Sequence, residues 1–139
     1  MGTIQTISAP RIVIVGVVYF VIGYGSTFLA IPSIRFWRLA AWAASAVVYG
    51  VHLAYEYFRR HNSPATTSIH IGLAVALGGF LLAVAATTHA VMISDHAPFT
   101  RFIIALFAWP LITGVPAFVV TFVSTAALRW LDVPPPPVS

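Results

Sequence analysis

The sequence predicts an all-α integral membrane protein, an antiparallel up-and-down bundle of four transmembrane helices. Of its 139 residues, 60% are hydrophobic and only 7% are charged, whereas a soluble globular domain carries about 25% charged residues. Four apolar runs lack the alternation of a strand, and each is near or above the roughly 20 residues that a helix needs to cross a bilayer. A helix satisfies its own backbone hydrogen bonds in lipid, so helices are expected and isolated strands are not.

The predicted spans are Arg11–Ile31, Phe36–Phe58, Ile69–Ile93 and Phe102–Leu128. The first run continues too far to be a typical signal peptide and is expected to be a retained helix. Short connections join the runs, so neighbouring helices should be antiparallel, with both ends of the chain on one side. The second connection is predicted to be the loop "RRHNSPATTS", with its last residue, Ser68, as the N-cap of the third helix.

The four helices make one predicted domain, residues 1–131, and a proline-rich tail follows over residues 132–139. Four consecutive prolines favour an extended polyproline II end. All seven cations are arginines, with four on the side of the chain ends and three on the other side. The positive-inside rule then favours cytoplasmic ends for a multi-pass membrane protein. Because the arginines fall at the ends of apolar runs, they indicate contact with lipid headgroups, and no nucleic-acid partner is expected.

Small residues recur at helical spacing on one face of the first, third and fourth predicted helices. In lipid, helices associate where small side chains let their backbones approach closely. We therefore expect a set of glycines to pack the helices together: Gly16, Gly23, Gly72, Gly79 and Gly114. The fourth helix also contains Pro110 and Pro116, and each proline is expected to kink it.

The second helix differs, because its polar side chains fall on one stripe. At a rise of 1.5 Å per residue, Glu56 lies roughly 6 Å and His52 about 12 Å inside the helix end at Arg60. The first interpretation is a buried polar ladder that fixes helix register. The second is a proton relay, since ionisable groups inside a membrane are often functional. Both interpretations use the same residues: Tyr49, His52, Glu56, Arg60 and His70.

Other chemistries find little support in the sequence. Without cysteine there are no disulfides and no thiolate metal sites. The histidines lie at unequal depths for a haem, and three possible metal ligands, His52, Glu56 and His70, lack a fixed fourth. No serine has histidine and acid partners at a recognisable spacing, and no phosphate-binding motif is present. We predict no catalytic residue, no metal and no cofactor.

Two functions remain. The first is an accessory or structural subunit of a larger membrane complex, which fits the small size and the lack of an active-site pattern. Its partners would be the lipid bilayer and other membrane protein subunits or further copies of the chain. The alternative is a small oligomeric transporter or proton-conducting protein that uses Glu56 and His52.

Overall fold

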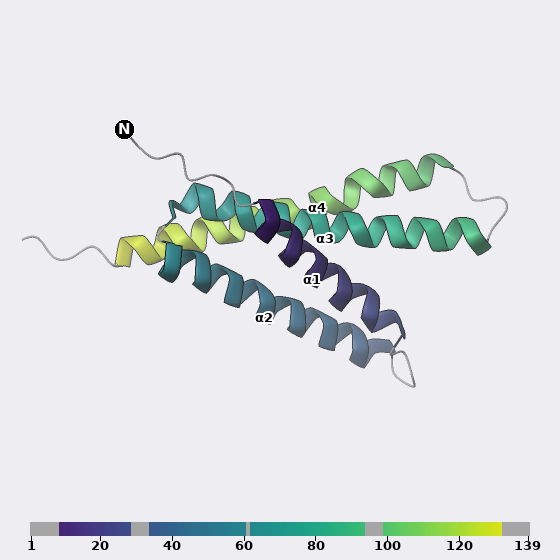
Figure 1. The fold of residues 1–139 in the computed structure, drawn as a ribbon, viewed down its shortest axis with the longest axis horizontal. Helices are drawn as coiled ribbons and strands as arrows, with labels where there is room; N and C mark the ends of the chain where they lie inside the picture. Colours follow the sequence, from purple (N-terminus) through teal and green to yellow (C-terminus); the bar gives the residue numbers. More distant parts are fainter. Residues whose placement is uncertain (1–8, 29–33, 61, 94–98, 132–139) are drawn as a thin grey trace, which may run out of the picture.

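Four α-helices make up the part of the chain that the computed structural model describes, residues 9–28, 34–60, 62–93 and 99–131. The all-helical class is confirmed over these residues, and each helix contains most of one predicted apolar run. The proline-rich tail, residues 132–139, lies outside the described residues, so its extended form stays a prediction. In chain order the helices are α1, Ala9–Phe28; α2, Ile34–Arg60; α3, Pro64–Ile93; and α4, Phe99–Leu131 (Figure 1).

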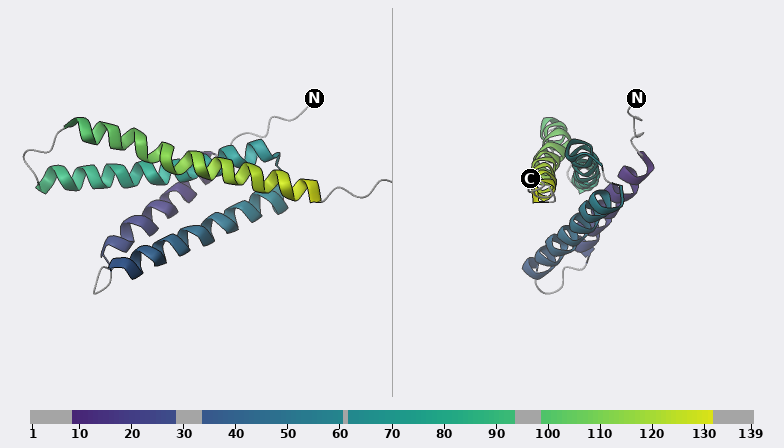
Figure 2. Two further views of the ribbon diagram at one scale, coloured as in Figure 1. Left: turned by 180° about the vertical axis from the view of Figure 1, so that it is seen from behind. Right: turned by 90° about the vertical axis from the view of Figure 1, so that its left-hand side faces the viewer.

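The helices form two antiparallel pairs that splay apart. One pair is α1 with α2 and the other is α3 with α4, and the chain reverses direction at each connection (Figures 1 and 2). Helix α3 is central, because it packs along both α4 and α1, whereas α2 contacts α1 and α3 over a shorter length. The arrangement is therefore more open around α2 than a closed four-helix bundle.

Helix α3 packs on two sides through small residues. A Cβ added to Gly79 would lie 2.5 Å from the hydroxyl oxygen of Thr113 in α4. A Cβ added to its neighbour Gly78 would lie 2.7 Å from the Cβ of Tyr19 and 3.1 Å from the carbonyl oxygen of Gly16, both in α1. Because adjacent positions of a helix point in different directions, Gly78 faces α1 and Gly79 faces α4. The sequence pattern traced only one face of this helix and missed Gly78.

The five glycines predicted to pack the helices all lie at helix contacts. An added Cβ on Gly114 would lie 2.8 Å from the Cβ of Ala76 and 3.1 Å from the carbonyl oxygen of Gly72. Gly16 of α1 lies against Leu77 of α3, and Gly23 lies against Leu82. A Cβ added to either glycine would lie 2.8 Å from a methyl carbon of the facing leucine. The backbones of α1 and α4 therefore approach α3 where a side chain would not fit.

The connection between α2 and α3 is much shorter than predicted. Most of the predicted loop "RRHNSPATTS" is helical, since α2 continues to Arg60 and α3 begins at Pro64. Ser63 is the N-cap, because its hydroxyl accepts a 3.2 Å hydrogen bond from the backbone N–H of Thr66. Proline then occupies the first helical position, where its missing N–H is not needed. The N-cap prediction for Ser68 was wrong: its hydroxyl donates within the helix to the carbonyl of Pro64.

Helix α4 runs without a break through Pro110 and Pro116. Each proline lacks the N–H that would bond to the carbonyl four residues earlier. Thr113, between the two prolines, donates its hydroxyl to the carbonyl of Trp109 at 2.8 Å. The prolines therefore do not end the helix, and the kink expected at each of them stays a prediction.

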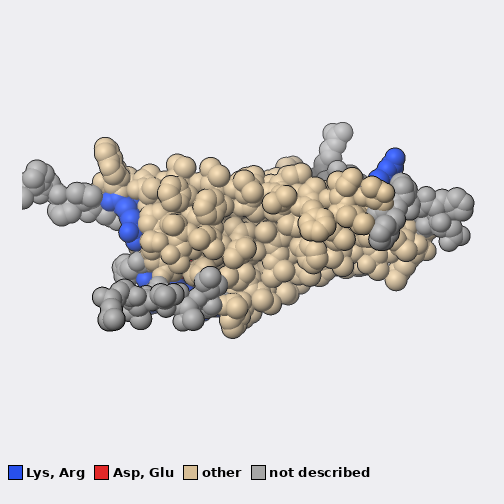
Figure 3. All heavy atoms as spheres, turned by 90° about the horizontal axis from the view of Figure 1, so that it is seen from above, with Lys and Arg blue, Asp and Glu red and all other residues tan. Residues whose placement is uncertain are grey.

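Two of the four helices are long and apolar enough to cross a membrane, by length and composition alone. They are α3 and, from Thr100 onward, α4, while the apolar helix within α1, Ala9–Gly25, is shorter. The face drawn in Figure 3 carries arginines towards its two ends, with a broad uncharged band between them. Large apolar side chains are exposed on every helix, for example Ile14, Trp42, Leu73 and Phe107.

Candidate functional site

The single acidic residue of the described segments, Glu56, is buried where α2 meets α3. It lies one turn before the end of α2 and is only 2% exposed. The short connection brings the first turns of α3 directly against this last turn of α2. Residues that follow Glu56 closely in the chain therefore cover its carboxylate.

Both oxygens of the Glu56 carboxylate face polar side chains. The Oε2 atom accepts a hydrogen bond from the side-chain amide of Asn62 and lies 3.4 Å from Nδ1 of His70. The Oε1 atom lies 4.0 Å from Nε2 of His52 and 4.0 Å from a guanidinium nitrogen of Arg60. We name these five residues, Glu56, His52, Arg60, Asn62 and His70, the Glu56 cluster.

Helix α4 joins the Glu56 cluster through the backbone. Arg129 donates a 2.7 Å hydrogen bond from its guanidinium to the carbonyl oxygen of Asn62. Asn62 thus links two helices, since its side chain holds Glu56 of α2 and its carbonyl holds Arg129 of α4. The carboxyl end of α4 is fixed beside the carboxyl end of α2.

Tyr49, predicted as part of the same ladder, belongs to a separate contact. Its hydroxyl lies 2.7 Å from the hydroxyl oxygen of Thr121 and 3.3 Å from the carbonyl oxygen of Ala117, both in α4. Thr121 is fully buried and donates to the same Ala117 carbonyl. The predicted set therefore divides: His52, Arg60 and His70 gather around Glu56, and Tyr49 bonds α2 to α4.

Several buried polar atoms near Glu56 have no hydrogen-bond partner among the described residues. They are Nδ1 of His52, Nε2 of His70, Oδ1 of Asn62 and the hydroxyl oxygen of Thr67. If both imidazoles present an N–H to the carboxylate, the free ring nitrogens are acceptors. Such nitrogens can take up a proton or bind water.

The described residues contain no group of three or more metal-binding side chains in an arrangement that would hold an ion. His52 and His70 approach different oxygens of Glu56, and one of the two distances is 4.0 Å. In the first shell of a metal ion, these ligand atoms would converge on one point about 2 Å from each. The cluster is built as a set of contacts to a carboxylate.

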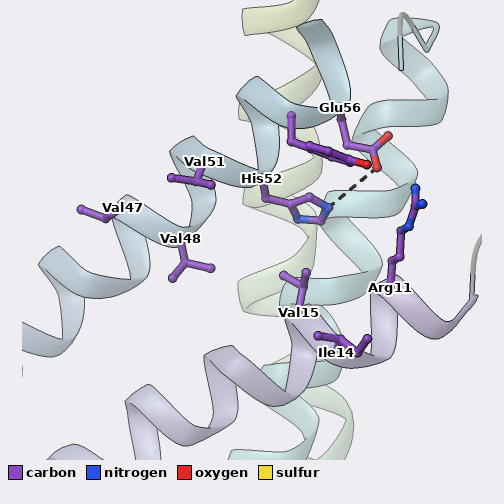
Figure 4. Close-up of a pocket in the computed structure, with 9 residues that line it drawn as sticks. Arg11, Ile14, Val15, Val47, Val48, Val51, His52 and Glu56 are labelled. Atoms are coloured by element: carbon purple, nitrogen blue, oxygen red, sulfur yellow. Dashed lines mark ion pairs between the residues drawn. The ribbon is translucent and has the colours of Figure 1, made fainter. Parts of the chain in front are cut away.

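A groove of about 410 Å³ lies between α1 and α2 and reaches the Glu56 cluster (Figure 4). Its walls are mainly aliphatic and are formed by Ile14, Val15, Val47, Val48 and Val51. At the end where the two helices diverge, the groove is lined by Arg11, Tyr55, His52 and Glu56. The guanidinium of Arg11 lies 5.9 Å from the ring centroid of Tyr55, within range of a cation–π contact.

Comparisons with protein families, with curated proteins and with solved structures give no match.

The sequence pattern missed three residues of this region. Asn62 and Thr67 lie within the predicted loop, and the sequence indicates Arg129 only as a cation at a helix end. The "NSP" stretch, a typical helix start, was the available signal that α3 begins early and that Asn62 lies beside Glu56. No sequence signal connects Arg129 to a carbonyl 67 residues earlier.

Proposed function

We propose that the chain is a multi-pass integral membrane protein with four spanning helices and cytoplasmic ends, and that it serves as an accessory, structural subunit of a larger membrane complex. The two long apolar helices, α3 and α4, support membrane insertion. Helix α2 has 27 residues, or about 40 Å at 1.5 Å per residue, which exceeds the roughly 30 Å of a bilayer core. Its charged residues lie near its two ends.

The observation that carries the structural role is the Glu56 cluster, in which the carboxylate is paired with side chains of the same chain. A buried carboxylate is costly unless it is paired and hydrogen-bonded, and here an amide, two imidazoles and a guanidinium surround it. Its members come from α2, the short connection and α3, and Arg129 adds α4. The cluster thus holds together the end of α2, the start of α3 and the end of α4 through polar contacts.

Away from the Glu56 cluster, α3 packs on its neighbours mainly through small and aliphatic residues. Leu77, Gly78 and Leu82 contact α1, and Gly79 contacts α4 beside the hydroxyl of Thr113. A proton or solute path would need polar groups or water across the whole thickness. The outer surface is rich in exposed large apolar side chains. In the proposed role, this surface contacts lipid and the partner subunits.

Site-specific photo-crosslinking in the native membrane tests the accessory role. A photoreactive residue replaces Trp42, which is 79% exposed on α2, and the matched control replaces Ala74, which is fully buried in α3. We expect position 42 to give an adduct with a larger membrane protein, and position 74 to give none. Adducts with lipid alone, or only with a second copy of the chain, would contradict an accessory role.

Proton conduction is the second candidate, favoured by the unpartnered imidazole nitrogens of His52 and His70 next to a carboxylate. The substitution Glu56→Gln separates the two functions, because an amide keeps the shape but cannot exchange a proton at working pH. In liposomes under a proton gradient, the structural role gives no flux with either form. Flux in the unmodified protein that disappears in a folded Glu56→Gln variant would establish conduction instead.

A further inference from the structure

We propose that the groove between α1 and α2 binds an anionic phospholipid of the bilayer. Its phosphate would lie against Arg11, and one acyl chain would lie between the aliphatic side chains of the two helices (Figure 4). The site goes beyond the accessory role, but it rests on the proposed membrane insertion.

The shape and lining of the groove fit a hydrocarbon chain. Its volume of about 410 Å³ is within the roughly 300–1,000 Å³ of small-molecule sites. Valines of α2 and aliphatic residues of α1 form its walls. From Glu56 back to Val47 the groove follows α2 for about 13 Å, at 1.5 Å per residue. In a bilayer, acyl chains are the apolar groups present at that depth.

The charge at the end of the groove fits a phosphate. Arg11 is exposed in the first turn of α1 and forms no ion pair among the described residues. Glu56 does not cancel its charge, because the carboxylate is buried and faces Arg60, two histidines and Asn62. A guanidinium presents paired N–H groups to phosphate oxygens. The ring of Tyr55 lies on one side of the Arg11 guanidinium, with its centroid 5.9 Å away.

A lipid satisfies this groove better than a second copy of the chain. A protein occupant would have to bring an anionic group to Arg11 together with an apolar segment. Glu56 is buried and already bonded. The other two acidic residues of the sequence, Asp95 and Asp132, follow the ends of α3 and α4 and do not lie within an apolar segment. An anionic phospholipid carries both features in one molecule, and arginine near the membrane surface attracts such lipids.

Lipid retention measured by native mass spectrometry tests the site. The purified chain is reconstituted in vesicles of equal amounts of phosphatidylglycerol and phosphatidylcholine, and then released from mild detergent in the mass spectrometer. We expect the unmodified chain to retain phosphatidylglycerol preferentially. Arg11→Gln should lower this retention about tenfold, the effect of losing a charged hydrogen bond. Val48→Phe, which fills the groove, should lower retention of both lipids.

Two control variants make the comparison specific. Arg101→Gln removes an exposed arginine at the start of α4, and Val119→Phe enlarges a half-exposed side chain of α4. Both should retain lipid as the unmodified chain does, and circular dichroism should show equal helix content for all variants. Equal retention of the two lipids, or equal loss in Arg101→Gln and Arg11→Gln, would overturn the site.

Membrane insertion is checked separately by extraction of the vesicles with alkaline carbonate. A chain that is extracted overturns both the proposed membrane protein and the lipid site. A chain that stays inserted but shows no preference for phosphatidylglycerol overturns the lipid site alone. A dimer mass that is lost on Val48→Phe, without bound lipid, would assign the groove to a second copy.

Discussion

The guanidinium of Arg129, in the last turn of α4, donates a 2.7 Å hydrogen bond to the backbone carbonyl of Asn62, which precedes α3. The side chain of the same Asn62 donates to Glu56 near the end of α2. Asn62, which directly precedes the N-cap of α3, therefore joins the end of α4 to a carboxylate of α2.

Replacement of Arg129 by glutamine should loosen α4 at this end. The shorter side chain cannot reach the Asn62 carbonyl, and loss of this hydrogen bond should lower the free energy of unfolding by about 1 kcal/mol. Arg101→Gln, at the other end of α4, is the matched control and should have little effect. Denaturant titration of the purified protein in detergent measures both, and equal effects would show that α4 is not held by this contact.

Removal of the Glu56 carboxylate should be the most damaging polar change in the protein. Glu56→Ala leaves the side chains of Asn62 and His70 without their shared acceptor and removes the ion pair with Arg60, which should cost about 1–3 kcal/mol. Glu56→Gln keeps one acceptor oxygen and should cost less. Arg59→Gln, an exposed neighbour on α2, is the control. Thermal unfolding in detergent ranks the stabilities of these variants. A Glu56→Ala variant as stable as Glu56→Gln would argue against a structural role of the Glu56 cluster.

An alanine at Gly114 should disturb the packing of α4 on α3. Its Cβ would lie 2.8 Å from the Cβ of Ala76 and 3.1 Å from a backbone oxygen, so the helices must move apart, at about 1–3 kcal/mol. Gly50→Ala is the control, because nothing lies within 4 Å of its added Cβ. That change should be neutral or stabilising, since alanine favours helix over glycine. Equal unfolding midpoints for the two variants would refute the close contact.

Single cysteines can test the four-span topology. Thr3→Cys, Ala65→Cys and Ser139→Cys should all react with an impermeant thiol reagent from the cytoplasmic side, and Thr100→Cys from the opposite side. Ala65 and Thr100 are exposed at the starts of α3 and α4. The chain has no cysteine of its own, so each label has one source. Reaction of positions 3 and 65 from opposite sides would remove one of the proposed spans.

The helices were predictable from the sequence because long apolar runs leave few alternatives to a helix. The glycines at helix contacts were also predictable, since small residues at helical spacing have few other uses in such a protein. Gly78 was missed because the spacing of small residues along one face of α3 does not indicate that this helix has neighbours on two sides. The partners of Glu56 were only partly predictable. His52, four residues before it, follows from helix periodicity, whereas Asn62 depends on where α3 begins and Arg129 on tertiary packing.

The nearness of Asn62 and His70 to Glu56 in the chain, 6 and 14 residues after it, bears on how the protein is made. Synthesis proceeds from the amino end, so the two side chains that contact Oε2 emerge soon after the carboxylate itself. The nascent second helix does not have to wait for a distant segment before its carboxylate is hydrogen-bonded. Arg129 emerges 67 residues after Asn62, so its bond to the Asn62 carbonyl can form only after α3 and α4 have been synthesised.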